Sequence, residues 1–490
     1  MTKKLFFLAA AAVLLAGCSA LEQTGQDETS AKDAPQAVGF GAYLNQGVST
    51  KAGPGGILTT AGDNALQTVG FGVFAYYSNG GLYNESTSKP DFMYNEKVTY
   101  DTDHWTYSPV KYWPNEYGAS AISEETDRLS FFAYAPWVEV TKTTGIPTGS
   151  AESGIIALSR NSAAGDPFVK YAVAFSPKSS VDLCWGVAAS NFTSSADPSN
   201  ENAVKAGWPY IDLWKPQIGE PGYINMNFKH ALAAVNFTID AWVDKNANDD
   251  PVATPSKVYV RSVTFEGFAS KGTLNLNSSN TSNETEVAPN WSGSSLGTKL
   301  DSSPITVFDG RRDGKEALYE ATNEKPANLN PLILQSNAYV PGAIDENYQY
   351  TSATNASGGV TETAVNLFDV SDWTYADPSN PAAEEIAAAL VAPIFVIPTD
   401  ETLKVTIVYD VETADATVTS FLSDGATHGT VVENKITKTI AINTTPVSLK
   451  AGTSYKVALH LGLTSVKFDA SVTAWPASTD AAEDMPANKE

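Results

Sequence analysis

Apolar and polar residues alternate at every second position in several short runs of this chain. The runs at 403–409, 455–461 and 466–474 show the pattern clearly. Successive side chains of a β-strand point to opposite faces of its sheet, so each run predicts a strand with one buried and one solvated face. Further strands are predicted at 38–44, 69–77, 129–135, 231–239 and 258–265. So many strands predict an all-β fold of antiparallel β-sandwiches.

The length of the chain predicts more than one such unit. A chain of 490 residues is expected to form two or three domains of roughly 100 to 200 residues each. Asn, Asp and Pro crowd together between residues 245 and 255, which is typical of an exposed boundary. We therefore predict an N-terminal β-sandwich domain over 52–250 and a C-terminal one over 251–475.

Three segments depart from the strand pattern. The stretch from Phe265 to about Ser303 is rich in Ser, Asn and Thr and is predicted to be a polar insertion. Residues 381–392 are rich in Ala, with two Glu near the start, and predict a helix. Residues 476–490 are polar and acidic and predict a tail without strands.

The first residues combine positive charge, an apolar run and a cysteine. Lys3 and Lys4 precede the apolar run 5–16, and small residues lead into Cys18. This order is typical of a secretory signal peptide over 1–17 that ends in a lipobox. The run is shorter than the roughly 20 apolar residues of a membrane-spanning helix. We therefore predict export and a lipid on Cys18, the alternative being an ordinary signal peptide with an incidental cysteine.

The charge balance argues against nucleic acid as a partner. The chain carries 55 acidic and 31 basic side chains, a net charge of −24. A surface this negative repels phosphate backbones. The acidity is interpreted as a solubility property of an exposed protein.

The sequence contains no recognisable catalytic or metal-binding motif. The histidines His104, His230, His428 and His460 are far apart and lack metal-ligand spacing. We expect no cofactor, no metal and no catalytic site, and Cys184 is predicted to be a small buried apolar residue. Carboxylates are abundant, so a pair of acidic residues in a hydrolase stays open as an alternative.

One segment is unusually aromatic. Residues 104–114 hold four large rings, including Trp105 and Trp113. Exposed rings of this kind could stack on sugars, whereas buried rings would form the core of a sandwich, which is the commoner role of large aromatic side chains. The first reading supports an alternative function, a surface lipoprotein that binds glycans through Trp105 and Trp113.

Several short motifs lie in order along the chain from the lipobox to Trp475, and none is recognised between about 270 and 390. The motifs are Trp105-Thr-Tyr-Ser-Pro-Val-Lys-Tyr-Trp-Pro114, Leu129-Ser-Phe-Phe-Ala-Tyr-Ala-Pro136, Phe228-Lys-His-Ala-Leu232, Leu449-Lys-Ala-Gly-Thr-Ser-Tyr455 and Val472-Thr-Ala-Trp475. Together they resemble the fimbrillin family of Bacteroidales, the subunits of type V fimbriae.

The resemblance implies a fold and a mode of assembly. It implies two transthyretin-like β-sandwich domains in a fimbrial lipoprotein that is carried to the outer membrane and the cell surface. There a trypsin-like protease removes the first strand, and a strand from another fimbrial subunit fills the emptied groove, which is β-augmentation. Such a protein supports adhesion, and a host protein or glycan is its expected ligand.

The N-terminal residues match this arrangement. Residues 18–51 would be a lipidated tether, first strand and propeptide, with cleavage between Lys51 and Ala52 in a Gly/Pro-rich loop. The family is expected to present arginine at this place, and this chain has lysine. The removable strand would bury Val38, Phe40, Ala42 and Leu44.

The C-terminal residues match less well. Stalk subunits are expected to donate a strand from their C-terminus, but the tail at 476–490 contains two prolines and several acids. Two alternatives are open: the strand at 466–474 is the donor, or this subunit accepts a strand without donating one. The donor residues would be Val466, Phe468, Ala470 and Val472.

Overall fold

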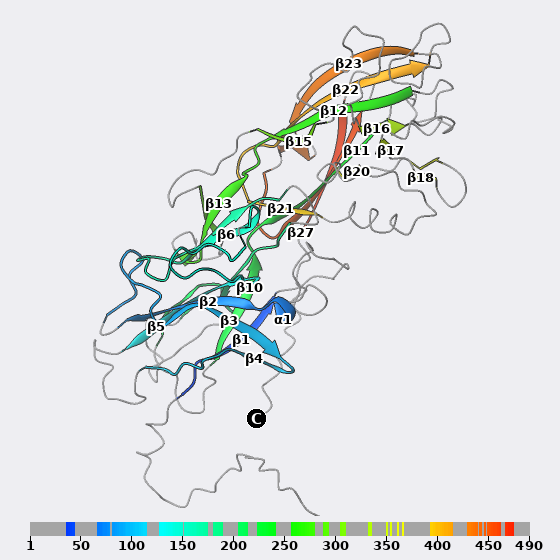
Figure 1. Ribbon diagram of the computed structural model, residues 1–490. Helices are drawn as coiled ribbons and strands as arrows, with labels where there is room; N and C mark the ends of the chain where they lie inside the picture. The colour runs from blue at the N-terminus through cyan, green and yellow to red at the C-terminus, as the bar shows by residue number, and fades with distance from the viewer. Residues whose placement is uncertain are drawn as a thin grey trace, which may run out of the picture.

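The computed structural model of the chain is built almost wholly of strands (Figure 1), which confirms the prediction of an all-β fold. In the described residues the helical element is α1, Leu66–Val69. The structure describes residues 36–44, 66–78, 81–114, 127–149, 151–174, 180–189, 204–213, 223–241, 256–279, 288–293, 304–309, 332–335, 349–350, 353–354, 360–361, 365–366, 393–414, 429–439, 441–442, 445–446, 448–461 and 466–474.

An eight-stranded sheet, here called the large sheet, forms one end of the molecule. Its order is β1-β10-β8-β5-β2-β3-β4, with β9 paired to β5. Its pairs are antiparallel except that β1 and β10 are parallel. The strands are β1 Gly39–Leu44, β2 Phe71–Ser78, β3 Met93–Asp101, β4 His104–Thr106, β5 Arg128–Ala135, β8 Cys184–Ala188, β9 Tyr210–Leu213 and β10 Tyr223–His230.

Both faces of the centre of the large sheet are buried, because alternate residues of β2 and β5 fill two different cores. Odd-numbered residues of β2 and β5, such as Phe71 and Phe131, face a first core with the side chains of β1. Even-numbered residues, such as Phe74 and Phe132, face a second core. We call the first the β1 core; it contains Val38, Phe40, Leu44, Leu66, Phe71, Val73, Ala75, Met93, Val98, Tyr107, Trp113, Leu129, Phe131, Ala133, Ala135, Cys184, Ala188, Val204, Tyr210, Leu213, Ile224, Met226 and Phe228.

The large sheet curls until its two ends meet around the β1 core. β1 lies at one end of the strand order and β4 at the other, yet the two strands contact each other (Figure 1). Just beyond β4, Tyr112 forms an antiparallel bridge with Ala37. β1, the first of the described strands, is therefore the element that closes the sheet.

A four-stranded sheet covers the second face of the large sheet. Its order is β14-β13-β7-β6. Val169 and Tyr171 of β7 and Leu274 of β13 enter the second core, here called the shared core, and meet Phe74 and Phe132 there. The strands are β6 Gly154–Leu158, β7 Phe168–Ala172, β13 Lys271–Asn275 and β14 Asn290–Ser292.

The position of β13 and β14 corrects one prediction. The stretch from Phe265 to Ser303 is not simply a polar insertion, since β13 and β14 lie within it and β13 pairs with β7. Two of its polar residues are buried for a reason: the side-chain amides of Asn275 and Asn277 donate to the carboxylate of Asp166 at 2.9 and 3.0 Å. Buried polar groups are tolerated when they are hydrogen-bonded in this way.

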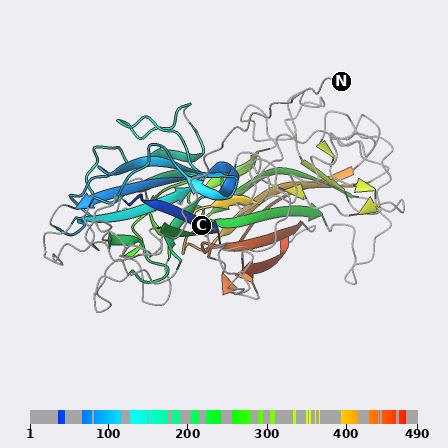
Figure 2. The same cartoon turned by 90° about the horizontal axis from the view of Figure 1, so that it is seen from below.

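Two further sheets form the other end of the molecule (Figures 1 and 2). A five-stranded sheet has the order β20-β11-β26-β27, with β21 paired to β11, and a six-stranded sheet has the order β17-β16-β12-β22-β23, with β15 paired to β12. β11 pairs in parallel with β26, and the rings of Phe237 on β11 and Phe265 on β12 lie 4.3 Å apart, centroid to centroid.

The strands of these two sheets include the longest of the described strands. They are β11 Ala233–Ala241, β12 Ser256–Glu266, β15 Ile305–Asp309, β16 Leu332–Gln335, β17 Gln349–Tyr350, β20 Val365–Asn366, β21 Ile394–Val396, β22 Lys404–Ala414, β23 Gly429–Thr439, β26 Thr453–Leu461 and β27 Val466–Ala474. Two small ladders pair β18 Ala353–Thr354 with β19 Val360–Thr361 and β24 Ala441–Ile442 with β25 Thr445–Pro446.

The two ends are joined at Ala231 and Leu232, between β10 and β11. Both residues are fully buried in the shared core, which continues without interruption from one end to the other. The backbone here is held from three sides: Ala231 N–H donates to Leu183 O at 2.8 Å, Trp291 Nε1–H donates to Ala231 O at 2.8 Å, and Gly452 N–H donates to Leu232 O at 2.9 Å. We call this junction the waist.

The predicted division at residue 250 falls outside the described residues, and the count of two domains stays a prediction. Strand pairing runs across this position in both directions. β13 and β14 lie after it and join the sheet of β6 and β7, whereas β11 lies before it and joins β26 and β27. Each end of the molecule therefore contains strands from both sides of the predicted boundary.

Several other predictions fall on residues outside those described. They concern Cys18 with the signal peptide, Lys51 and Ala52, the helix at 381–392 and the tail at 476–490. Among the described residues, no helix has the length and apolar character needed to cross a membrane.

The sharing of strands between the two ends makes a prediction about fragments. Residues 1–250 alone lack β13 and β14, so the shared core loses its cover and we expect no cooperative thermal unfolding by circular dichroism. Co-expression with residues 251–490 is expected to restore a cooperative transition. A fragment 1–250 that unfolds cooperatively by itself would show that β13 and β14 are not needed for the shared core.

Candidate functional site

The four residues predicted to line a removable strand lie on β1 or just before it. Val38, Phe40 and Leu44 are buried in the β1 core, with 1%, 3% and 3% of their surface exposed. Ala42 is half-buried and packs against the same core. The alternation in the sequence thus identified the buried face of β1, while its removal remains a prediction.

Phe40 makes the central contacts of β1. Its ring lies edge-on to Phe71 at 6.2 Å, Tyr107 at 5.4 Å and Phe131 at 6.0 Å between centroids. Edge-to-face pairs of this kind contribute beyond simple burial. These partners come from β2, the segment after β4 and β5, so one side chain of β1 contacts three separate parts of the large sheet.

The backbone of β1 is held from two sides. On one side, residues Gly39–Leu44 pair in parallel with Tyr223–Phe228 of β10. On the other, Val38 N–H donates to Lys111 O and Trp113 N–H donates to Gln36 O, both at 2.9 Å. We call the residues that contact β1 on these two sides and in the β1 core the β1 site.

The hydroxyl of Tyr107 strengthens the second of these sides. It donates to Val38 O at 2.8 Å and accepts from Lys111 N–H at 3.1 Å. Burial raises the pKa of Tyr107 to about 12, so its proton remains in place at neutral pH. The stability that this shift contributes is present below the unfolded pKa of 10 and is lost as the pH rises from 10 to about 12.

Removal of this hydroxyl is expected to loosen β1. Tyr107→Phe keeps the ring against Phe40 but leaves Val38 O and Lys111 N–H without this partner, at a cost of about 1–2 kcal/mol. Hydrogen exchange of the β1 amides, followed by mass spectrometry, should then be roughly 5- to 30-fold faster. The matched control is Tyr112→Phe, because Tyr112 is 52% exposed. Equal protection of β1 in both variants would contradict this role of Tyr107.

The aromatic segment mostly packs within the protein. Trp113 is 5% exposed and lies edge-on to Phe131 at 5.8 Å. Trp105 is half-buried, with its ring 5.0 Å from that of Phe71. Burial of Trp113 leaves little ring surface for a sugar, so the arrangement favours the core role, and glycan contact at Trp105 and Trp113 remains an untested prediction.

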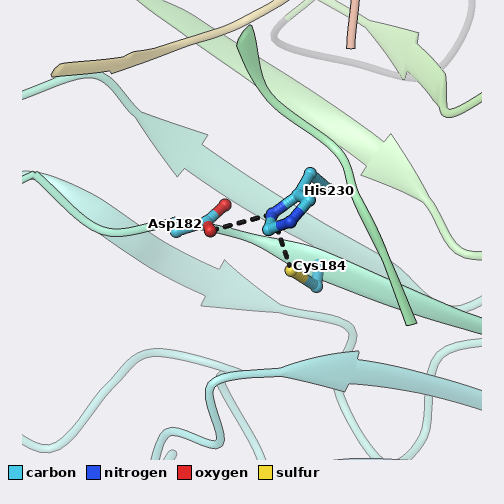
Figure 3. A group of neighbouring side chains, drawn as sticks. All are labelled: Asp182, Cys184 and His230. Atoms are coloured by element: carbon cyan, nitrogen blue, oxygen red, sulfur yellow. Dashed lines mark hydrogen bonds and ion pairs between the residues drawn. The ribbon is translucent and has the colours of Figure 1, made fainter. Parts of the chain in front are cut away.

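A second group of polar side chains lies at the waist (Figure 3). Asp182, Cys184 and His230 place one oxygen, sulfur and nitrogen atom within 4.8 Å of one another. Nδ1 of His230 lies 2.9 Å from Asp182 Oδ2 and 3.6 Å from Cys184 Sγ. The register of the antiparallel pair β8–β10 sets Cys184 opposite His230.

This group was not found from the sequence. Asp182 and His230 are 48 positions apart, and a register between distant strands brings them together. A weak signal existed: Asp182 and Cys184 are two positions apart and therefore lie on one face of an extended chain.

The geometry limits the chemistry of the group. In a nucleophile relay, the cysteine and the carboxylate bind different nitrogens of the histidine, but here both lie nearest Nδ1. Burial and the nearby charge of Asp182 raise the pKa of the Cys184 thiol, which disfavours the reactive thiolate. The three atom types are zinc ligands, but a closed zinc site takes four, so the group offers part of one.

The thiol is therefore expected to be inert in the native state. In a Cys18→Ser variant, which leaves Cys184 as the single cysteine, we expect no alkylation by iodoacetamide at pH 8 and complete alkylation in guanidinium chloride. The measurement is intact mass. Rapid alkylation of the native protein would instead indicate an activated thiol.

The predicted donor residues lie on a strand that is already paired. β27, Val466–Ala474, pairs with β26 over nine residues at the edge of the five-stranded sheet. To be donated, this strand must first give up those pairs. Its role as donor is untested.

Comparison with known proteins finds a similar fimbrium subunit. No protein-family model matches the chain. A segment of 139 residues is 31% identical to fimbrium subunit Fim1C of Phocaeicola vulgatus. The chain is similar to a fimbrium subunit. This segment covers 28% of this chain and 31% of the relative, so the match spans about a third of the length of that relative.

A solved structure is similar over more of the chain. The crystal structure of a fimbrial protein from Bacteroides vulgatus covers 89% of this chain and 99% of its own, with 18% identity and a TM-score of 0.43. The resemblance to fimbrillins that the sequence motifs indicated is confirmed by the match to the fimbrium subunit.

Proposed function

We propose that this protein is a structural or accessory subunit of a type V fimbria on the bacterial surface, where it supports adhesion. A lipid on Cys18 delivers it to the outer membrane, and a protease then cuts between Lys51 and Ala52. The observation that carries the proposal is the position of β1: an N-terminal strand closes a sheet and fills its core.

Chain connectivity makes β1 separable. β1 ends at Leu44 and α1 begins at Leu66, so β1 joins the rest of the fold covalently through residues 45–65. A single cut after Lys51 would leave β1 held by non-covalent contacts alone. Partner subunits of the same fimbria could then replace it.

Loss of β1 would create a strong acceptor for another strand. It would uncover apolar side chains of the β1 core, including Phe71, Phe131 and Phe228, and free the edge of β10. Burying a side chain the size of Phe is worth about 1.5–3 kcal/mol, and an open edge offers backbone hydrogen bonds as well. A strand with the same alternation would regain both, which is donor-strand exchange.

The proposed role of the protein involves no enzymatic activity. The relative bears the name of a fimbrium subunit, and the buried thiol of Cys184 lacks the arrangement of a nucleophile. On the donating side, the proposal keeps two alternatives: β27 is donated after it leaves β26, or this subunit accepts a strand without donating one.

Controlled proteolysis tests the proposal. Full-length protein carrying Cys18→Ser is treated briefly with trypsin, and N-terminal sequencing is expected to give a stable product that begins at Ala52. After the cut, a strand of an added fimbrial subunit should displace the first strand, and the protein should join such subunits into polymers. Lys51→Gln is the matched control, because trypsin can still cut it after Lys32, which leaves β1 attached.

Two outcomes would contradict the proposal. One is a product cut after Lys51 that neither releases β1 nor binds any added strand. The other is protein from intact cells that begins at Cys18 in assembled fimbriae, since the first strand would then have stayed in place.

A further inference from the structure

The outward face of β1 differs from its inward face. Gly39 and Gly41 alternate with Val38, Phe40 and Ala42, the residues that face the β1 core. The parallel register sets Gly39 beside Tyr223 and Gly41 beside Asn225 of β10. Both pairs lie on the face of the sheet opposite the β1 core, because Ile224, between Tyr223 and Asn225, enters that core.

A side chain at either glycine would force the neighbouring side chain on β10 to move. A Cβ atom on Gly39 would lie within 3.0 Å of the ring of Tyr223, and one on Gly41 would lie within 3.0 Å of Oδ1 of Asn225. Real Cβ atoms do not approach other atoms this closely. Neither glycine has the left-handed φ that favours glycine for conformational reasons. In a strand, such a glycine marks close approach of another group.

Tyr223 and Asn225 thus lie over the backbone of β1. The ring of Tyr223 covers Gly39, an arrangement in which an aromatic side chain shields a glycine on the neighbouring strand. Tyr223 is 39% exposed, so a bulky neighbour could push it into solvent at the loss of this contact. Asn225 is half-buried, and its amide would have to turn away from Gly41 to make room for a Cβ atom.

We propose that the β1 site selects its partner strand by glycine at the two outward positions beside Tyr223 and Asn225. The partner is a strand of another subunit that alternates large apolar residues, which fill the places of Val38, Phe40 and Leu44, with these two glycines. This inference rests on the proposed strand exchange and adds the chemistry of the strand that is accepted.

The rule excludes the C-terminal strand of this chain as the partner of a second copy. No glycine occurs between Leu463 and Glu490. If Val466, Phe468, Ala470 and Val472 filled the core positions, the outward residues would include Lys467, Asp469 and Ser471, all of which carry a Cβ. The C-terminal strand of a second copy therefore does not meet the rule, and this chain does not extend a filament of its own copies through 466–474.

Strand exchange with synthetic peptides tests the rule. The protein is full-length Cys18→Ser cut after Lys51, and the probe is a fluorescent peptide of residues 36–45 in excess. The measurement is the fraction of label that co-elutes with the protein at equilibrium. We expect the native peptide to enter and Gly39→Val and Gly41→Val peptides to enter about tenfold less well or worse, the scale expected of overpacking.

Matched controls separate this clash from a general effect of valine. A Tyr43→Val peptide changes an outward position that already carries a side chain and should enter like the native peptide. The Asn225→Ala protein should bind the Gly41→Val peptide as the unchanged protein binds the native peptide. The Tyr223→Ala protein should likewise bind the Gly39→Val peptide. A peptide of residues 466–474 should behave like the valine variants.

The outcomes distinguish the two proposals. If the native and both valine peptides enter equally, the glycine rule is wrong and strand exchange stands. If the native peptide does not enter, strand exchange itself is overturned and the rule falls with it. Entry of the 466–474 peptide as well as the native one would overturn the exclusion of a second copy.

Discussion

The pairing of β1 with β10 closes the large sheet around the β1 core. β10 supplies a row of backbone groups and the core residues Ile224, Met226 and Phe228, and β1 covers them from the far end of the chain. Everything inside the β1 core depends on that cover, including Phe71 and Phe131. The pair is formed between segments widely separated in sequence, and such contacts are slow to form because loop-closure entropy opposes them. A contact that folding forms slowly is thus also one that a single cut could make replaceable.

The local pattern of the sequence identified most long strands, because alternation reports directly which face of a strand is buried. β1, β2, β5, β11, β22, β26 and β27 lie close to their predicted ranges. Partners were much harder to predict. Nothing local shows that β1 runs parallel to β10, that Cys184 stands opposite His230, or that the Ser- and Asn-rich stretch after Phe265 contains β13. Polar residues misled there because Asn275 and Asn277 are buried against Asp166, a partner more than a hundred positions earlier.

The waist gives the molecule its coherence. Separate sandwiches joined by a linker could move independently, since interfaces between domains are usually modest. Here the shared core passes through Ala231 and Leu232, and strands from each half of the sequence complete the sheets of the other. The hydrogen bonds of Asp182, His230 and Trp291 cluster at the same place. Packed side chains and continuous backbone therefore join the sheet that contains the β1 site to the far end of the molecule.

The parallel alignment of β1 with β10 has a mechanical consequence. β10 continues through the waist into β11, along the long axis of the molecule (Figure 1). Consider a strand that is paired with β10 and pulled along that axis. The force would act in shear on all of its backbone hydrogen bonds at once, so they would not break one after another. Shear resists tension far better than sequential opening because many bonds must fail together. An attachment of this kind would suit the proposed fimbria, in which each subunit would be held by a strand of its neighbour.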